Sequence, residues 1–385
     1  MTNYDILVIG AGPAGSAAAT TAAAAAAGYR VALLDKASFP RNKLCGGLFT
    51  GRSRSYYREI FGADFDTTGA VTRDAIEFWH EGSRLARLED VPPFNLTMRV
   101  ELDNTLFQHA LAAGAEDWTG HAIAEIDGGG VTLKDGTRLE ASIIIGADGV
   151  NSIAAKHLFG KAFDTGTIGF GLEIEASPAE QSPQDQPLRI DFASATWGYG
   201  WSFPKQGSTT VGVGGLRSAN PDMKDKMSSY LTSLGLDGDT KRFKGHHLPF
   251  GDFRAIPGRK NILLAGDAAG LVDPITGEGI AFAMKSGQLA AQSAITALSQ
   301  DTSDKALALY QTSLKEMHRS LWIARNLRRI IFAPKWQSAF TGTFRRSGTV
   351  RMMYMQLLAG EMEYPELARA VVRRLPRYVL NRFRR

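Results

Sequence analysis

The chain has 385 residues but only one cysteine, Cys45. One cysteine excludes an intrachain disulfide framework and an iron–sulfur cluster held by four cysteines of this chain, and we expect no metal site. The sequence contains no run of about 18 apolar residues, so no membrane span is predicted. We also expect no signal peptide, because the first residues do not show a basic segment followed by an apolar stretch and a cleavage site. We therefore expect a cytoplasmic protein that at most contacts a membrane surface.

Charge is unevenly distributed. The chain has a net charge of +5, yet residues 319–385 hold 15 Lys and Arg against three Glu. Such a tail binds anionic lipid or nucleic acid, or simply favours solubility. No nucleic-acid-binding motif accompanies it, so no nucleic-acid partner is expected. Aromatic residues among the arginines suit peripheral membrane contact, while a helix that packs its apolar face on the core explains them equally well; they are Trp322, Phe332, Trp336 and Phe344.

The order of patterns predicts an α/β protein. Residues 5–10 and 30–35 predict buried strands on either side of a helix that ends at Gly28. Strand patterns then dominate residues 165–217, and helical patterns follow from Lys305 onward. Further expected elements are a hairpin over 71–90, a helix from near Glu101, a hairpin turning at Asp135 and Gly136, a helix over 221–235 and a strand–turn–helix unit from 261.

We interpret this order as a Rossmann-type dinucleotide-binding domain interrupted by an antiparallel β-sheet substrate domain and followed by a helical C-terminal region. The predicted boundaries are 1–70, 99–160 and 250–300 for the first domain, 71–98 and 161–249 for the second, and 301–385 for the helical region.

A glycine motif carries the dinucleotide prediction. Gly10, Gly12 and Gly15 form G-x-G-x-x-G between a predicted strand and a predicted helix. The first glycine permits the tight turn, the second lets a pyrophosphate approach the backbone, and the third lets helix and strand pack closely. Asp35 ends the second strand, where an acid accepts hydrogen bonds from a ribose. The free N–H groups of the helix N-terminus face the phosphates.

Three segments resemble the p-hydroxybenzoate hydroxylase superfamily of FAD-dependent oxidoreductases. Residues 262–287, "ILLAGDAAGLVDPITGEGIAFAMKSG", resemble its second flavin-binding motif, which implies that Asp267 binds the ribitol chain. "GADGVNS", 146–152, resembles its D-G motif and places Asp148 near the cofactor, and Arg99 resembles its FAD-contacting arginine. The resemblance implies FAD. No second nucleotide motif is present, so we expect the electron donor to be NAD(P)H or a reduced electron carrier.

Two further segments resemble the geranylgeranyl reductase family within that superfamily. "YGWSFPKQGSTTVGVG", 199–214, matches its isoprenoid-cavity pattern, and "FPRNKLCGGL", 39–48, matches its C-G-G loop beside the flavin. "LAGEMEYPEL", 358–367, resembles a family ending. Alternate residues of a strand face one side, so Tyr199, Trp201 and Phe203 form one aromatic row. Such rows more often fill a core than line a cavity, and the resemblance favours the cavity.

The residues expected at each site follow from these motifs. We expect FAD contacts from Gly10, Gly12, Ala14, Gly15, Asp35, Lys36, Cys45, Gly46, Gly47, Arg99, Asp148, Gly149, Gly266, Asp267, Gly277, Gly279 and Ile280. We expect substrate contacts from Tyr199, Trp201, Phe203, Pro204, Gly212 and Gly214. Asp273 and Glu278 lie in the flavin loop and are expected to be structural or to contact flavin.

The resemblance implies reduction of isolated double bonds in a geranylgeranyl or polyprenyl chain. Hydride passes from N5 of reduced flavin to one carbon, and a proton reaches the other from Cys45, Tyr199 or water. An aromatic monooxygenase on the same scaffold is the alternative. Halogenases of the superfamily carry W-x-W-x-I-P, which this chain lacks. Related flavoproteins that pass electrons to quinone need a cysteine-ligated cluster, which the single cysteine of this chain cannot supply.

Cys45 has two interpretations. Most free cysteines are small, inert hydrophobes. Alternatively, the glycine-softened loop presents Cys45 to flavin and substrate, as proton donor or as a residue that shapes the pose of the alkene. Arg41 and Lys43 are expected nearby, where they would stabilise a thiolate. The resemblance favours the catalytic interpretation.

Overall fold

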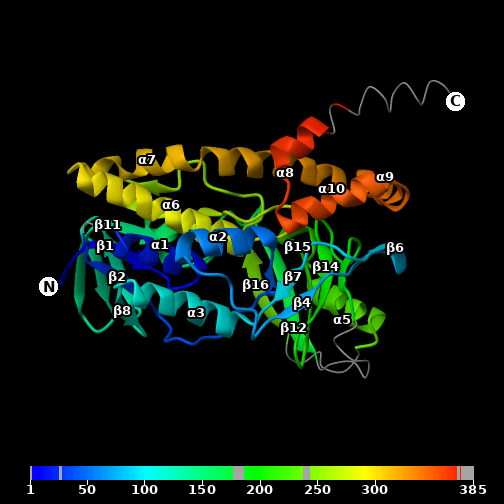
Figure 1. Cartoon of the computed structure of the whole chain (residues 1–385), viewed down its shortest axis with the longest axis horizontal. Helices are drawn as coiled ribbons and strands as arrows, with labels where there is room; N and C mark the ends of the chain where they lie inside the picture. Colours follow the sequence, from blue (N-terminus) through cyan, green and yellow to red (C-terminus); the bar gives the residue numbers. More distant parts are fainter. Residues whose placement is uncertain (1, 26–27, 177–185, 237–242, 371–372, 374–385) are drawn as a thin grey trace.

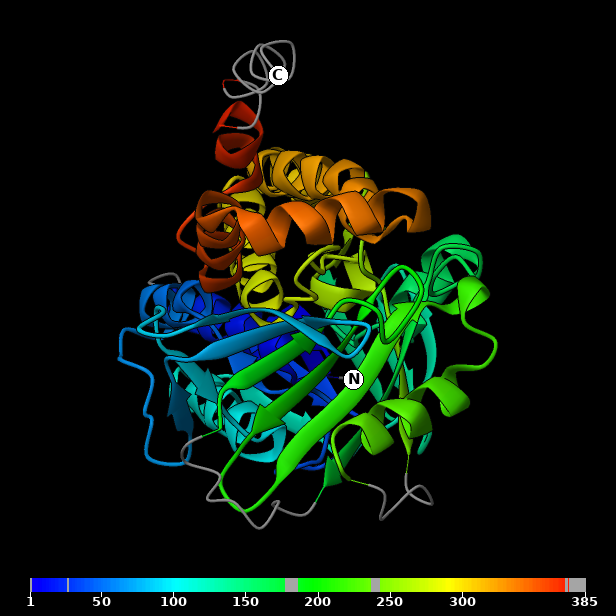
Figure 2. The same cartoon turned by 90° about the vertical axis from the view of Figure 1, so that its right-hand side faces the viewer.

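The computed structural model describes residues 2–25, 28–176, 186–236, 243–370 and 373. It confirms a mixed α/β fold with a helical C-terminal region. Two large sheets lie side by side, and a layer of helices runs along both (Figure 1). The view from the end shows the same helical layer above the second sheet (Figure 2).

The first sheet has the strand order β17-β18-β11-β1-β2-β8. Its central strands are parallel because helices connect them, as in a dinucleotide-binding fold. The strands are β1 (Thr2–Ile9), β2 (Val31–Asp35), β8 (Glu116–Thr119), β9 (Ile123–Asp127), β10 (Gly130–Leu133), β11 (Arg138–Gly146), β17 (Gly258–Arg259) and β18 (Ile262–Leu264). The hairpin predicted at Asp135 and Gly136 is confirmed between β10 and β11.

The second sheet has the order β16-β12-β15-β14-β13-β5-β6. It is antiparallel except where β13 runs parallel to β5, a strand from a distant part of the sequence. The strands are β5 (Ile76–His80), β6 (Ser83–Leu88), β12 (Gly169–Ala176), β13 (Leu188–Asp191), β14 (Tyr199–Pro204), β15 (Thr209–Leu216) and β16 (Lys244–Leu248). A small sheet joins β3 (Leu48–Phe49), β7 (Phe94–Leu96) and β4 (Val71–Arg73). The predicted domain boundaries stay predictions.

The helices surround these sheets. They are α1 (Pro13–Ala23), α2 (Gly51–Phe61), α3 (Arg99–Ala112), α4 (Ile153–Phe159), α5 (Met223–Ser233), α6 (Ile280–Ser299), α7 (Ala306–Ser313), α8 (Lys315–Phe332), α9 (Pro334–Arg346) and α10 (Gly348–Ala359). The described part of the chain contains no helix with the length and hydrophobicity of a bilayer span.

The end of α1 was predicted wrongly. The helix ends at Ala23 and not at Gly28, because Ala24 already caps its last turn. Gly28 has φ +66°, a left-handed conformation that glycine adopts without strain, and it lies in the turn that leads into β2. The alanine run hid this boundary, since alanine favours helix at every position.

Close packing of α1 on α6 brings the two nucleotide-side motifs together. A Cβ added to Gly287 of α6 would lie 2.0 Å from the carbonyl oxygen of Ala14. A Cβ on Gly15 would lie 1.6 Å from the carbonyl oxygen of Gly10. Both glycines therefore permit backbone contacts that any side chain would prevent.

We predict that Gly287→Ala destabilises the protein by about 1–3 kcal/mol, because the added methyl group forces α1 and α6 apart. The control is Gly342→Ala in α9, where the nearest neighbouring atom, 3.5 Å away, belongs to the flexible side chain of Arg346. Alanine improves helix propensity there by up to about 1 kcal/mol. Urea unfolding of both variants measures the difference; equal stabilities would show that α1 and α6 tolerate separation.

Candidate active site

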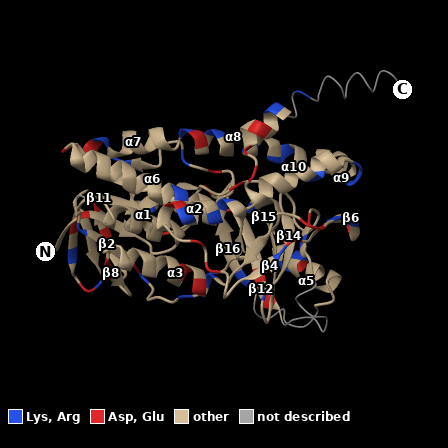
Figure 3. Ribbon diagram, in the orientation of Figure 1, with Lys and Arg blue, Asp and Glu red and all other residues tan. Residues whose placement is uncertain are grey.

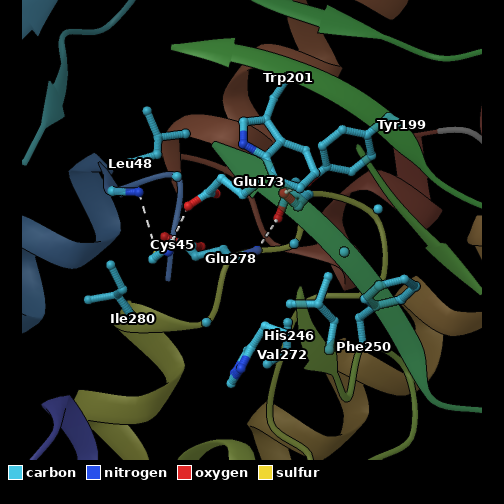
Figure 4. Close-up of a pocket in the computed structure, with 18 of the residues that line it drawn as sticks. Cys45, Leu48, Glu173, Tyr199, Trp201, His246, Phe250, Val272, Glu278 and Ile280 are labelled. Carbon is cyan, nitrogen blue, oxygen red and sulfur yellow. Dashed lines mark hydrogen bonds between the residues drawn. The ribbon is translucent and has the colours of Figure 1, made fainter. Parts of the chain in front are cut away.

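A cavity of about 200 Å³ lies where the two sheets and the helical layer meet. Its wall is mostly apolar and comes from the second sheet, the loop that carries Cys45, the loop before α6, and the C-terminal helices (Figure 4). Its apolar lining includes Leu48, Ile190, Trp197, Leu248, Phe250, Val272, Phe332 and Leu358. The cavity therefore joins segments that are distant in sequence.

The glycine turn has the form that a dinucleotide needs. Gly10 has φ +97°, and Gly12 is the N-cap of α1. Within the described structure, no side chain caps this helix end, so its N–H groups are available to phosphate. The carboxylate of Asp35 accepts the N–H groups of Ala11 and Ala37, both at 2.9 Å, which holds the acid against the turn.

Arg41 adds a cation to this turn. Its Nη2 lies 3.3 Å from the position that a Cβ on Gly12 would occupy, and its Nη1 lies 3.2 Å from the buried carboxylate of Asp103. The expected effect of Arg41 on the Cys45 thiol stays a prediction, while Asp103 and Asp35 hold its guanidinium at the glycine turn. A guanidinium there is suited to a pyrophosphate. The sequence gives no local signal for this role.

Lys43 extends toward Asp267. Its Nζ lies 3.7 Å from a carboxylate oxygen of Asp267. His246 on β16 lines the same part of the cavity, and burial, with a smaller effect of Lys43, lowers its pKa to about 4. The imidazole is therefore neutral at neutral pH. Gly279 and Ile280 begin α6 at this wall, so the helix N-terminus faces the cavity.

Two buried carboxylates anchor the loop before α6. Glu278 accepts hydrogen bonds from Thr50 and Arg52 of the segment that begins α2. Asp273 accepts the hydroxyl of Tyr364 at 2.8 Å and the backbone N–H groups of Ile275 and Thr276. This contact gives the segment "LAGEMEYPEL" a structural role, because Tyr364 joins the C-terminal region to the flavin loop.

The Cys45 loop bridges the two sheets. The backbone N–H of Cys45 donates to Glu173 on β12 at 3.0 Å, and the Cys45 sulfur accepts the N–H of Gly47 at 3.4 Å (Figure 4). Arg99, held by Asp103 at 2.7 Å, faces that sulfur. Gly47 has φ +76°, and a Cβ there would lie 2.0 Å from the carbonyl oxygen of Thr97. Arg99 is therefore a cation beside the sulfur that the sequence analysis did not assign to it.

Glu173 is a cavity residue that sequence analysis missed. Its side chain is buried, and this burial raises its pKa to about 7, against a smaller opposing effect of Lys205. Glu173 and Glu175 alternate with Leu172 and Ile174, a pattern typical of a strand with one solvated face. The loop that covers this face comes from a distant part of the chain, so the strand pattern could not reveal the burial.

The aromatic row lies in the cavity wall. Tyr199, Trp201 and Phe203 all line it, and the Tyr199 hydroxyl donates to the carbonyl of Thr276 at 2.6 Å (Figure 4). The Trp201 ring lies across β15, where a Cβ on Gly212 would lie 2.2 Å from it. Gly214 lines the cavity beside that ring, while Pro204 is buried outside the lining.

The other expected cofactor residues fall into two groups. Those that line the cavity are Cys45, Gly46, Gly47, Arg99, Asp267, Gly277, Gly279 and Ile280. Those outside it are Gly10, Gly12, Ala14, Gly15, Asp35, Lys36, Asp148, Gly149 and Gly266. Asp148 accepts the N–H of Ile153 at 2.6 Å and holds the start of α4, and the Lys36 side chain is exposed. Their roles toward the cofactor stay predictions.

Comparison with known proteins identifies the class. A family model described as FAD dependent oxidoreductase matches residues 5–157. A menaquinone reductase of Mycolicibacterium smegmatis is 31% identical over 93% of this chain and 91% of its own. A geranylgeranyl diphosphate reductase of Rhodobacter capsulatus is 32% identical over 77% and 76%. A geranylgeranyl bacteriochlorophyll reductase-like structure from Thermoplasma acidophilum has a TM-score of 0.78 and 22% identity, covering 96% of this chain and 99% of its own.

The fold and these matches define an FAD-dependent oxidoreductase. The chain belongs to the geranylgeranyl reductase family of these flavoproteins. The glycine turn, the uncapped start of α1 and the start of α6 at the cavity fit its cofactor, FAD.

We predict that Glu173→Gln stabilises the protein in a pH-dependent way. The folded-state pKa of about 7 lies above the reference value of 4.5, so the folded state holds a proton that the unfolded state releases. Wild-type stability therefore falls as pH rises from 4.5 to about 7, by about 3 kcal/mol. Glutamine has no such titration, and it still accepts the Cys45 N–H.

The measurement is urea unfolding of both proteins at several pH values across that range. The stability of the variant relative to wild type should grow with pH and level off above neutrality. A difference that does not change with pH would show that Glu173 titrates normally.

Proposed function

We propose that this protein uses FAD to reduce isolated C=C bonds in a polyprenyl chain. The observation that carries the proposal is the apolar, aromatic-lined cavity that ends at the Cys45 loop and the start of α6. Menaquinone and geranylgeranyl diphosphate, named in two of the relatives, both carry polyprenyl chains. A long apolar chain is the ligand that such a wall binds best.

The residues of the chain hold the alkene and exclude water. FAD, when bound and reduced, supplies the hydride. Trp201 and Phe203 are proposed to hold the prenyl chain against the Cys45 loop, since both line the cavity next to Gly46. Cys45 of that loop lines the cavity and is proposed to act on the alkene, either as proton donor or by shaping its pose. An isolated double bond has no carbonyl to polarise, so alignment and exclusion of water carry the catalysis.

The function is tested by anaerobic reduction of the purified yellow protein followed by addition of geranylgeranyl diphosphate or menaquinone in detergent. We expect the flavin to reoxidise without oxygen while the product gains two hydrogens per reduced bond, as measured by mass spectrometry. Reoxidation that needs oxygen and hydroxylates an aromatic compound would instead establish a monooxygenase.

Trp201→Ala should slow this prenyl-dependent reoxidation while the flavin spectrum stays intact. Trp201 is partly buried, and truncating a fully buried Trp costs about 3–5 kcal/mol of stability, so circular dichroism must confirm folding. The matched control is Trp118→Phe on β8, whose indole hydrogen-bonds Tyr4 far from the cavity. A folded Trp201→Ala variant with unchanged turnover would remove Trp201 from the substrate site.

We also propose that the C-terminal helices contact a membrane surface. Phe332 and Phe344 are buried, whereas Trp322 is 60% and Trp336 51% exposed. Ile330 and Met352 are exposed on the same helices. Lys and Arg residues occur along α8, α9 and α10 (Figure 3). Exposed indoles among cations suit an anionic bilayer surface, from which a prenyl lipid would enter.

The double variant Trp322→Ala/Trp336→Ala should bind phosphatidylglycerol vesicles at least about tenfold more weakly than wild type. The control is Ile256→Ala, an apolar side chain that is 55% exposed on the loop before β17. Cosedimentation at low and high salt separates the electrostatic contribution of the arginines to binding from the apolar contribution of the indoles, because salt screens only the charges. Equal binding by all three proteins would contradict membrane contact through these helices.

A further inference from the structure

Three carboxylates line the cavity, and they differ in their partners. Asp267 lies 3.7 Å from Lys43, and Glu278 is bonded to Arg52. Among the ion pairs of the described residues, none includes Glu173. Its Oε1 instead accepts the backbone N–H of Cys45 at 3.0 Å. Glu173 is therefore a buried carboxyl without a direct ionic partner in the part of the chain that the structure describes.

The position of Glu173 joins the two halves of the cavity. Its carboxyl lies between the Cys45 loop and the indole of Trp201 (Figure 4). The loop belongs to the flavin side of the cavity, and the indole belongs to the proposed substrate wall. A proton held there is next to both the cofactor side and the substrate side.

We propose that Glu173 donates the proton that completes reduction of the prenyl double bond, an inference that rests on the proposed function. One alkene carbon gains the hydride, and the π electrons form a new C–H bond at the other carbon with the proton of the Glu173 carboxyl. The double bond becomes a single bond, the reduced cofactor returns to its oxidised form, and Glu173 is left as a carboxylate.

The surroundings of the Cys45 sulfur favour a different role for that residue. The sulfur accepts the Gly47 N–H, and the guanidinium of Arg99 faces it. The sulfur thus serves as a hydrogen-bond acceptor within its own loop, which is a positioning role. Cys45 then acts as the residue that shapes the pose of the alkene, while its backbone N–H orients Glu173.

Lys205 and Glu175 are placed to stabilise and reprotonate the Glu173 carboxylate that forms when the proton is donated. Lys205 is buried, and its Nζ lies 3.4 Å from Oε1 of Glu175, which is partly exposed. Glu173 and Glu175 lie two residues apart on β12, so both face the same side. The ammonium stabilises the new carboxylate, and Glu175 connects the pair to solvent, from which the proton is replaced.

The protonation state is the one that a donor requires. Burial raises the pKa of Glu173 to about 7, with Lys205 lowering it and Glu175 raising it. The carboxyl therefore still carries a proton near neutral pH. The other ionisable groups that line the cavity are Lys43, Cys45, Arg99, Tyr199, His246, Asp267 and Glu278.

The test measures flavin reoxidation by geranylgeranyl diphosphate from pH about 5 to about 9 after anaerobic reduction. The wild-type rate should fall as pH rises through about 7. Glu173→Gln should be at least about a hundredfold slower and lose that fall. Cys45→Ala keeps the backbone N–H, so it should be slower but retain the fall at the same pH.

The neighbours of Glu173 give a signature that a structural role would not produce. Lys205→Met removes a cation and should move the fall to higher pH, while Glu175→Gln removes a like charge and should move it to lower pH. A readout without turnover is the infrared carbonyl band of the protonated carboxyl, taken as wild type minus Glu173→Gln. That band should disappear as pH rises through about 7.

The outcomes separate the inference from the proposed function. If Glu173→Gln keeps the wild-type rate and pH profile, the inference is overturned and prenyl reduction stands. If no prenyl substrate reoxidises wild type, the function fails and the inference fails with it. Should Glu173→Gln lose FAD, the paired shifts in Lys205→Met and Glu175→Gln decide, and shifts in the same direction would overturn the proposal.

Discussion

The loop from Asp273 to Gly279 places two buried carboxylates beside the cavity, and the surrounding structure depends on satisfying them. Glu278 is paired with Arg52, and Asp273 accepts Tyr364 and two backbone N–H groups. A buried charge that loses its partner costs about 3–5 kcal/mol. The loop can therefore keep its shape only while α2 and the segment after α10 stay in place.

This dependence makes the cavity a property of the whole described chain. Phe332 of α8 and Leu358 of α10 line it directly, and Tyr364 holds the flavin loop from behind. Helix α8 both carries the exposed indole of Trp322 and lines the cavity through Phe332. If the proposed membrane contact holds, an apolar chain leaving a bilayer would meet α8 beside the cavity.

Sequence predicted what depends on local pattern and missed what depends on distant packing. The β-α-β unit and its hairpins were predictable because strand alternation, glycine spacing and turn residues act over short distances. Glu173 and Cys45 are 128 residues apart, and Arg52 and Glu278 are 226 apart. The sequence of β12 shows an ordinary alternating strand, so only the covering loop reveals that Glu173 is buried. Arg41 was noticed in the sequence, but its partner Asp103, 62 residues away, was not.

An apolar cavity that performs a proton-dependent reaction faces an electrostatic conflict. A carboxylate would oppose the binding of a prenyl chain, since its hydration would be lost when the chain covers it. A neutral carboxyl at Glu173 avoids that cost at the moment of binding, because burial has already raised its pKa to about 7. The anion forms only after the proton has left, and the Lys205 ammonium is then close enough to stabilise it. The same burial that favours binding of the lipid thus keeps the Glu173 carboxyl protonated until the double bond is reduced.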